Sequence, residues 1–376
     1  MQFSINSELL KSTFLTARKA LSPKPLVIEQ HSFRLDLTED GSLSVQSDDG
    51  ESHIKVSVPI GTEGFLSGAM LVNANVMLEF LSTISNAEIS LKDNNGKSVT
   101  LTWPGGHADI STPGELKDFP DAPILDDTAE HFGISQKDLL DGINHTFYAT
   151  KQDELRPFMS GVRINASEEG IEMVGTDSCI LSILSGKKGI DVINKSAFTL
   201  PIKAASILKG QLDDKDEEPA NIEFDSKNIR FSTDSLTFTT RHTCGRFPKY
   251  MDVIPQVRSN ILVCSKKELL NALRRVAVCS DFASRILTFD FSENGLTISG
   301  EDKNYKTSSR ETVVGASFEG TPTQIGIKAQ ALSDILSTIP TENVRIYVNG
   351  NRPLLITPDT ENDDYKVVLV ASAPRK

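Results

Sequence analysis

The sequence predicts an α+β protein made of three similar domains, each with two helices packed against antiparallel sheets. Two observations support this fold class. A helical segment recurs three times at a constant spacing, and much of the sequence between the copies alternates between apolar and polar residues, as antiparallel strands do. A chain of 376 residues has the length of two to three domains, and the repeat favours three.

The recurring segment has a short apolar lead, an Asn or Ser as helix cap, and an acidic residue directly before a Leu-Leu pair. Successive pairs are 130 residues apart: Leu9/Leu10, Leu139/Leu140 and Leu269/Leu270. In the third copy, Ser265 and Glu268 occupy the positions of a capping box. Because cap, acid and pair recur together, chance is a poor explanation. The expected domains are residues 1–122, 123–256 and 257–376.

The expected elements follow one order in every domain: a short strand, a helix, several strands, a second helix and further strands. Helical spacing of apolar residues and capping residues mark the six helices. They are expected at residues 7–21, 73–84, 135–149, 201–212, 265–280 and 328–339. Alternating segments suggest about eight strands in each domain. Two proline-containing stretches, residues 117–128 and 249–260, are interpreted as linkers.

Composition limits the compartment and the class of protein. No apolar run approaches the ~18 residues that span a bilayer, and the N-terminus lacks the pattern of a signal peptide. The four cysteines show no paired spacing, so we expect reduced thiols in a cytoplasmic protein that does not bind membranes. The net charge of −12 argues against a simple nucleic-acid binder, which is usually basic.

The charge is unevenly distributed. In chain order the six expected helices, with the third counted over residues 135–151, carry +2, −1, 0, +2, +3 and 0, so the whole acidic excess lies in the remaining sequence. If the helices line one surface, that surface attracts phosphate while the rest of the molecule repels it. No aromatic residues alternate with the basic ones, which favours sequence-neutral phosphate contacts over base stacking. The alternative is that these are ordinary solvated helix faces.

No catalytic or metal-binding pattern is specific enough to assign. Residues 96–98 read Gly-Lys-Ser, like the end of a phosphate loop, but Leu91 stands where that motif requires glycine. His242 and Cys244 could supply two metal ligands, but no second close pair accompanies them. The acidic runs 213–218 and 361–364 are interpreted as solvated loops. We therefore expect a binding role without a metal, a cofactor or catalysis.

Several short motifs carry a family likeness. The most specific is residues 244–250, Cys-Gly-Arg-Phe-Pro-Lys-Tyr, similar to a family motif Gly-Arg-Phe-Pro-Asp-Tyr. It is joined by Thr176-Asp177, Leu200-Pro201, the Asp-Phe-Pro of residues 118–120, and the segments RPFMSGVRI and NVRIYV. On these motifs the whole chain resembles the bacterial sliding clamp family, the beta subunit of the replicative DNA polymerase III.

The resemblance implies a head-to-tail homodimeric ring of six similar domains, with helices lining the hole and sheets forming the rim. Duplex DNA would thread the hole without sequence-specific contacts. The function implied is topological and non-catalytic: the ring tethers the replicative polymerase and other clients that carry a short hydrophobic motif. A clamp loader complex would place it on DNA.

The resemblance also assigns residues by motif. It implies DNA contacts at Lys24, Lys151, Gln152, Arg156, Lys203, Lys267 and Arg274. It implies a dimer contact at Ala108, Ile110, Val278 and Cys279. The client-peptide pocket would use Arg156, Phe158, Met159, Thr176, Ser178, Cys179, Ile180, Leu181, Pro248, Asp252, Val253, Pro353, Val367, Leu369 and Val370.

Two departures from the family pattern fall in the implied pocket. After Thr-Asp the family has Gly-His-Arg, whereas this chain has Ser178-Cys179-Ile180, and its C-terminus reads VASAPRK. We therefore expect a clamp with altered client preference. Two alternatives stay open: a repeat scaffold that binds protein partners only, and an enzyme whose site forms between domains.

Overall fold

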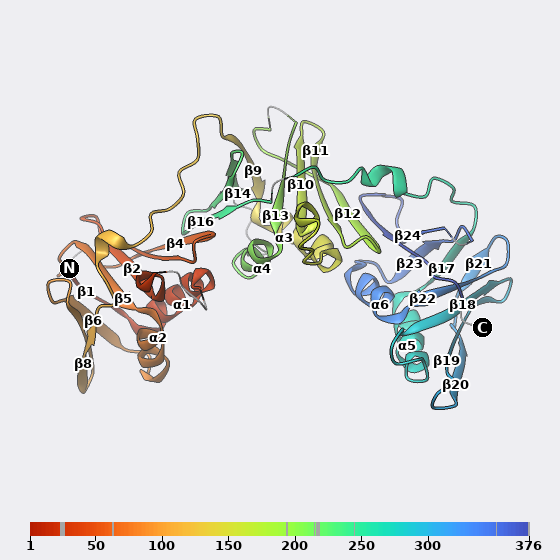
Figure 1. Ribbon diagram of the computed structural model, residues 1–376, viewed down its shortest axis with the longest axis horizontal. Coiled ribbons are helices and arrows are strands. Elements are labelled where there is room, and N and C mark those ends of the chain that lie inside the picture. The colour runs from red at the N-terminus through yellow and green to blue at the C-terminus, as the bar shows by residue number, and fades with distance from the viewer. Residues whose placement is uncertain are drawn as a thin grey trace. The chain divides into compact units, whose positions relative to one another are not determined.

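The computed structural model describes residues 1–22, 27–61, 64–192, 195–213, 215, 219–243, 245–350 and 352–374 (Figure 1). Packing divides the chain into two compact units. The first consists of Met1–Lys137, Ile190–Val192 and Ser206–His242, and the second of Asp138–Gly189, Ile193–Ala205 and Thr243–Lys376. The middle of the sequence therefore contributes residues to both units, and the three-domain boundaries expected from the repeat stay a prediction.

The first unit contains an eight-stranded and a four-stranded antiparallel sheet. In spatial order, the larger sheet is β5 (Gly68–Asn73), β2 (Ser32–Leu37), β3 (Ser42–Asp48), β4 (Ser52–Pro59), β16 (Leu236–Arg241), β15 (Asn228–Ser232), β14 (Pro219–Phe224) and β9 (Glu130–Ser135). The smaller sheet is β1 (Gln2–Asn6), β6 (Glu88–Asp93), β7 (Ser98–Trp103) and β8 (Gly106–Ser111). The β4–β16 pairing, with Ile54 opposite Phe238, joins the first part of the chain to the middle part.

The second unit repeats this plan with a nine-stranded and a four-stranded antiparallel sheet. The larger is β13 (Ser196–Pro201), β10 (Gly161–Ser167), β11 (Gly170–Thr176), β12 (Ile180–Lys187), β25 (Tyr365–Leu369), β24 (Leu354–Pro358), β23 (Asn343–Tyr347), β17 (Ile261–Ser265) and β21 (Ser317–Glu319). The smaller is β20 (Thr307–Thr312), β19 (Gly295–Asp302), β18 (Ile286–Ser292) and β22 (Thr323–Lys328). Here the β12–β25 pairing joins the middle part to the last.

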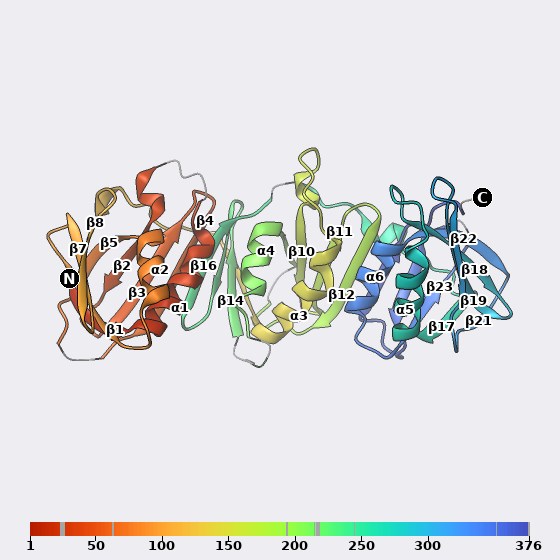
Figure 2. The same ribbon diagram turned by 90° about the horizontal axis from the view of Figure 1, so that it is seen from below.

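Helices pack in pairs against these sheets. In the first unit α1 (Ser7–Ala17) lies beside α2 (Ala74–Thr83), and in the second α5 (Lys266–Ala277) lies beside α6 (Ala329–Thr338) (Figure 2). The helices α3 (Gln136–Thr146) and α4 (Ile202–Lys209) contribute residues to both units. Short 3₁₀ turns are η1 (Arg18–Ala20), η2 (Ile28–His31), η3 (Leu116–Asp118), η4 (Phe147–Ala149), η5 (Pro157–Met159) and η6 (Tyr250–Val253). The predicted α+β fold class is confirmed.

The repeated helix starts are built as the sequence predicts. Asn6 Oδ1 accepts hydrogen bonds from the N–H groups of Glu8 (2.9 Å) and Leu9 (3.3 Å), and Ser265 Oγ accepts one from Glu268 N–H. The equivalent leucine is the fourth residue of each helix, and it is fully buried in every copy: Leu10, Leu139 and Leu269. Burial thus selects the second leucine of the first pair but the first leucine of the other two.

Four helices end three or four residues earlier than predicted: α1, α3, α4 and α5. In α1 and α5, side chains from other elements bind the last carbonyls. In α1, Ser47 Oγ donates to the Ala17 carbonyl at 2.5 Å, and the chain tightens into η1. In α5, Ser309 Oγ donates to the Val276 carbonyl at 3.1 Å and Arg285 to the Ala277 carbonyl at 3.2 Å. These partners lie far along the chain, so helical periodicity does not reveal them.

Six strands have no specific prediction from the sequence: β5, β8, β13 and β20 to β22. The edge strand β20 reads Thr-Ser-Ser-Arg-Glu-Thr and has no apolar residue, so it carries no alternation to detect. Its place is set by pairing with β19, with Ser299 opposite Arg310. Among the described residues, no helix has the length and apolar character to cross a membrane.

Candidate functional site

The turn between β11 and β12 in the second unit organises one group of predicted residues. Thr176 Oγ1 donates to the Ile180 carbonyl at 2.8 Å, and Asp177 Oδ1 accepts from the N–H groups of Cys179 (2.8 Å) and Ile180 (2.7 Å). Ser178 has φ of +76°, in the left-handed region that favours glycine. Three hydrogen bonds therefore hold a strained residue at the tip of the turn.

Arg156 connects this turn to the preceding loop. Its Nη1 donates to Ser178 Oγ at 3.0 Å, and its Nε donates to Asp153 Oδ2 at 2.8 Å. The bond from Arg156 lowers the pKa of Asp153. A guanidinium that is bonded on two sides has fewer free donors. Arg156 is therefore better suited to line a pocket in a fixed position than to contact the phosphates of sliding DNA.

A pocket of about 280 Å³ lies beside this contact. It brings together three predicted DNA-contact residues and four predicted peptide-pocket residues, with Arg156 in both sets. Its lining residues are Lys151, Gln152, Asp153, Glu154, Arg156, Met159, Thr176, Asp177 and Ser178. All of these except the buried Met159 are polar, so the pocket can recognise a ligand with polar groups as well as an apolar side chain.

The remaining pocket residues on β12 and β25 divide between the two faces of the nine-stranded sheet. Leu181 lies in an apolar cluster that also contains Phe247 and Val368. Ile180, Val367 and Leu369 belong instead to the core that includes Leu269 and Leu332 of α5 and α6. Since successive residues of a strand point to opposite faces, these three cannot face the same space as Leu181 within the sheet.

Val368 is a residue that the sequence reasoning missed. It stands directly opposite Leu181 in the β12–β25 ladder and shares its apolar cluster. The alternation along residues 365–370 could have identified it, because Val368 and Val370 have the same parity. Val370, just after the strand, is 49% exposed.

The segment after residue 245 is fixed onto the face that carries Leu181. The Tyr250 hydroxyl donates to Glu172 and accepts from Asn165 Nδ2 at 2.9 Å, and burial followed by the Glu172 contact raises the pKa of Tyr250. Arg163 lies 5.9 Å from the centre of the Phe247 ring. Of the predicted residues on and around this segment, Pro248, Asp252 and Val253 are exposed, while Phe158 and Pro353 are half-buried.

Helix α5 carries two unpaired cations on one stripe. Lys267 and Arg274 are seven residues apart, which places them on the same face of the helix, and both are exposed. Within the described part of the chain neither has an acidic partner. Their neighbours differ: Lys266 Nζ donates to the Ile339 carbonyl at 2.6 Å, and Arg275 Nε donates to Glu311 at 2.9 Å. Lys203 is exposed on α4, and Lys24 lies outside the described residues.

The predicted dimer-contact residues lie at two sheet edges. Ala108 and Ile110 are on β8, which pairs only with β7 in the described chain. Cys279 and the 78% exposed Val278 follow α5, which packs against β20. That strand is likewise an edge and pairs only with β19 in the described chain. Sequence reasoning missed β20 and also the neighbouring Phe282, whose largely exposed ring lies 4.8 Å from the Arg285 guanidinium.

Metal-binding geometry is not found among the described residues: no group of three or more His, Cys, Asp and Glu side chains there could hold an ion. His242 Nε2 lies 3.0 Å from the Asp225 carbonyl, and Cys244 is outside the described residues.

Comparisons with known proteins match two parts of the chain to one family. Residues 133–249 match the central domain of the DNA polymerase III beta subunit, and residues 251–372 match its C-terminal domain. The beta sliding clamp of Vibrio cholerae is 24% identical over 333 residues, covering 88% of this chain and 89% of that protein. That of Haemophilus influenzae is 22% identical over 371 residues, covering 98% and 99%.

Solved structures share the fold along the whole chain. The DNA polymerase III subunit beta from Pseudomonas aeruginosa superposes with a TM-score of 0.91 at 22% identity, covering 99% of this chain and 100% of that one. The DNA polymerase sliding clamp from Bacillus subtilis superposes with a TM-score of 0.90 at 19% identity, covering 100% of both. At this identity the likeness establishes the fold.

Replacing Ser178 by Gly and by Ala separates two effects. Both changes remove the Oγ that accepts from Arg156, but only Gly avoids the steric penalty of a Cβ at this positive φ. We expect S178G to be more stable to unfolding than S178A by about 1 kcal/mol. Urea unfolding of the full chain measures the difference. Equal midpoints for the two variants would contradict a left-handed conformation at Ser178.

Proposed function

The chain belongs to the DNA polymerase III beta subunit family and is a DNA sliding clamp, and we propose on this basis that it works as a head-to-tail homodimeric ring around duplex DNA. In this role it tethers the replicative polymerase during replication, after a clamp loader complex has opened and closed the ring. The proposed place of action is the cytoplasm. The role requires binding and topology only, with no turnover by the chain itself.

The observation that carries the ring is that β8 in the first unit and β20 in the second are edge strands, each with one strand partner among the described residues. An edge strand presents unpaired N–H and C=O groups that another strand can pair with. The two strands have six residues each, so one can pair along the length of the other. If β8 of one protomer pairs with β20 of its partner, the contact is head-to-tail, and a ring of two protomers closes when the rotation between them is a half-turn.

Apolar side chains next to these edges support the same contact. On β8, Ala108 is half-buried and Ile110 is buried in the core of the first unit, so the exposed apolar side chains are Val278 and Phe282, which follow α5 on the side of β20. Val278 and Phe282 are more than three-quarters exposed in the single chain. Large exposed apolar side chains of this kind are typical of a surface that is covered by a partner.

The unpaired cations of α5 support the DNA contact. Lys267 and Arg274 can neutralise phosphates without first breaking an ion pair, whereas Arg275 is held by Glu311. Contacts to phosphate carry no sequence information, which suits a ring that must slide. The rest of the chain is acidic and repels DNA, so the basic stripe would concentrate the attraction at one surface.

The client pocket is proposed on the sheet face that carries Leu181 and Val368, together with the pocket beside Arg156. Leu181 and Val368 are buried in the apolar cluster there, so the hydrophobic side chains of a short peptide would pack beside the 49% exposed Val370, and the polar lining near Ser178 suits the peptide backbone. Ile180, Val367 and Leu369 would then act by supporting the strand from the opposite face. Ser178 and Cys179 occupy the exposed turn and set the altered client preference.

Retention on circular DNA tests the proposed function directly. The protein is loaded on a nicked plasmid with an ATP-driven clamp loader, freed from unbound protein by gel filtration, and the plasmid is then cut once. Because a closed ring can leave only over a free end, we expect it to stay on the circle and to dissociate after cutting. Retention that cutting does not change would indicate binding by contact alone. A chain that never loads would favour the protein-only scaffold.

The α5 stripe gives a second prediction. Neutralising Lys267 and Arg274 together, as K267Q/R274Q, should weaken binding to a short duplex and flatten its salt dependence by about 0.9 in the log–log slope for each phosphate that the variant no longer neutralises. Fluorescence anisotropy at several salt concentrations measures both. The matched control is K266Q, which removes one equal charge from a residue already bonded to the Ile339 carbonyl. If K266Q weakens duplex binding as much for each charge removed, then binding depends only on the net charge of the protein and not on these two positions.

The edge contact gives a third prediction. V278E places a charge on a side chain that is exposed in the single chain, so the fold is unaffected, but in the ring this charge would be buried without a partner. We expect the dissociation constant of the dimer to rise at least about tenfold. Sedimentation across a range of concentrations measures it. The control is I124E, at an 88% exposed residue away from both edges, and V278E dimers as tight as those of I124E would contradict the proposed interface.

A further inference from the structure

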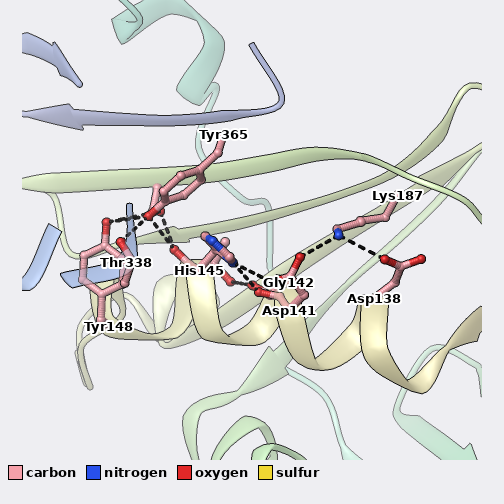
Figure 3. Close-up of polar contacts among 10 residues, drawn as sticks. Asp138, Asp141, Gly142, His145, Tyr148, Lys187, Thr338 and Tyr365 are labelled. Carbon is pink, nitrogen blue, oxygen red and sulfur yellow. Dashed lines mark hydrogen bonds and ion pairs between the residues drawn. The ribbon is translucent and has the colours of Figure 1, made fainter. Parts of the chain in front are cut away.

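A buried polar cluster in the second unit has no part in the proposed DNA contacts (Figure 3). Its centre is the hydroxyl of Tyr365 on β25. That hydroxyl lies 2.6 Å from Thr338 Oγ1 on α6, 3.2 Å from the Tyr148 hydroxyl in η4, and 3.4 Å from Ser182 Oγ on β12. Tyr365 is buried, so four elements meet at one polar atom that is shielded from water. Such networks hold their elements in one arrangement when every member is satisfied.

A charged group on α3 and β12 continues the cluster. Lys187 Nζ lies 3.0 Å from Asp138 Oδ1 and 2.6 Å from Asp141 Oδ2. Asp141 Oδ1 in turn lies 3.1 Å from His145 Nδ1. The hydrogen bond with His145, followed by the bond with Lys187, lowers the pKa of Asp141 to about 2 although burial opposes it. Asp141 is therefore ionised at neutral pH and links the lysine to the histidine.

His145 belongs to both parts of the cluster. Its ring packs edge-on against Tyr365 with the ring centres 4.6 Å apart. Its backbone carbonyl accepts from Ser182 Oγ at 2.6 Å and from the Tyr365 hydroxyl at 3.3 Å. A change in the charge of the imidazole therefore acts directly on the hydroxyls that join β12 to β25.

A protonated His145 balances the formal charges of the ion pairs in this group. Asp138, Asp141 and Lys187 together carry one net negative charge, which an imidazolium cancels. Burial alone lowers the pKa of His145, but the hydrogen bonds and the charge of Asp141 outweigh it, so the pKa lies above its ordinary value of 6.5. The stabilisation from the protonated ring is therefore complete below pH 6.5 and is lost as the pH rises through the folded-state pKa.

Several other charged and polar groups surround His145. They are Asp141 and Asp138 of α3, Lys187 and Ser182 of β12, Tyr148 of η4, Tyr365 of β25, and Thr338 of α6 through Tyr365. Burial raises the pKa of both tyrosines, so their hydroxyls stay protonated. Of Asp141, Lys187, the two tyrosines and the imidazole, the imidazole is thus the group that titrates in this range.

The cluster lies on the two strands that carry the proposed peptide pocket. In the β12–β25 ladder Ser182 is opposite Val367 and Leu181 is opposite Val368. At the other end, the Val370 N–H donates to the Cys179 carbonyl at 2.9 Å. Five residue pairs join β12 to β25, so the two strands shift relative to each other as rigid segments. A shift between Tyr365 and Ser182 therefore also shifts Leu181 relative to Val368.

We propose that His145 and Tyr365 are positioning residues for the peptide pocket, which hold β12 and β25 in register, and that protonation of His145 tightens the pocket so that peptide affinity falls as the pH rises through neutrality. The inference rests on the proposed function, which assigns the pocket to these strands. Client binding by this clamp would then respond to pH through a cluster whose central residue, Tyr365, packs on the opposite face of the sheet from Leu181.

Hydrogen exchange tests the cluster without any ligand. Protection factors of the β12 and β25 amides, corrected for intrinsic exchange, are measured in the full-length protein at about pH 6 and pH 8. We expect protection in the wild type to be at least about threefold lower at the higher pH. H145Q should show no such change, whereas H131Q, at an exposed histidine of the first unit, should behave as the wild type. A pH dependence in H145Q equal to that of the wild type overturns the proposal.

Peptide binding tests the link to the pocket. The probe is a fluorescein-labelled peptide covering the hydrophobic clamp-binding motif of the cognate replicative polymerase, followed by anisotropy over the same pH range. We expect affinity to fall at least about threefold in the wild type and to stay level in H145Q. Y365F should weaken binding at both pH values by more than Y148F, because Tyr365 has four polar neighbours.

The outcomes separate the two proposals. Wild-type binding with the same pH profile in H145Q and unchanged affinity in Y365F overturns the positioning role and leaves the clamp function intact. A wild type that is retained on circular DNA but binds no peptide at either pH overturns the pocket assignment and with it the positioning role. Protection factors that change with pH only when His145 is present support the proposal.

Discussion

The structure depends on two antiparallel strand pairings, β4 with β16 and β12 with β25. Each pairing continues a sheet from one part of the chain into the next, so the larger sheet of each unit contains strands from two of the repeats. A one-residue slip in either pairing would turn every side chain to the opposite face. The apolar clusters on the two faces of the nine-stranded sheet, around Leu181 on one side and Leu369 on the other, make such a slip costly because both faces are buried.

This constraint explains how binding residues can be placed at strand ends and edges. The strands themselves are held by their core, while Ser178 and Cys179 in the turn and Val370 directly after β25 are exposed. The same division holds at the sheet edges, where β8 and β20 are held on one side only. The binding surfaces proposed for this fold therefore lie at the ends of strands and at the edges of sheets.

Electrostatics follow a similar division. The acidic excess lies outside the helices. On α5 each of the free cations, Lys267 and Arg274, stands next to a basic residue that is bonded within the chain, Lys266 and Arg275 respectively. Only the free pair can exchange water for phosphate without breaking an internal bond. Inside the second unit, the charged residues around Asp141 and Lys187 are paired with one another rather than left free for a ligand. Their ion pairs hold neighbouring elements together.

The sequence by itself determined the α+β class, the six helices with their caps at Asn6 and Ser265, and the family likeness, because these rest on local periodicity and short motifs. Only the tertiary structure decided which leucine of each pair is buried, where β20 lies, and that Leu181 and Ile180 face opposite sides of one sheet. It also decided the contacts of the Tyr365 hydroxyl with Thr338, Tyr148 and Ser182, which come from three other elements. Contacts of this kind have no period in the sequence, since they depend on which strands pair and in which register.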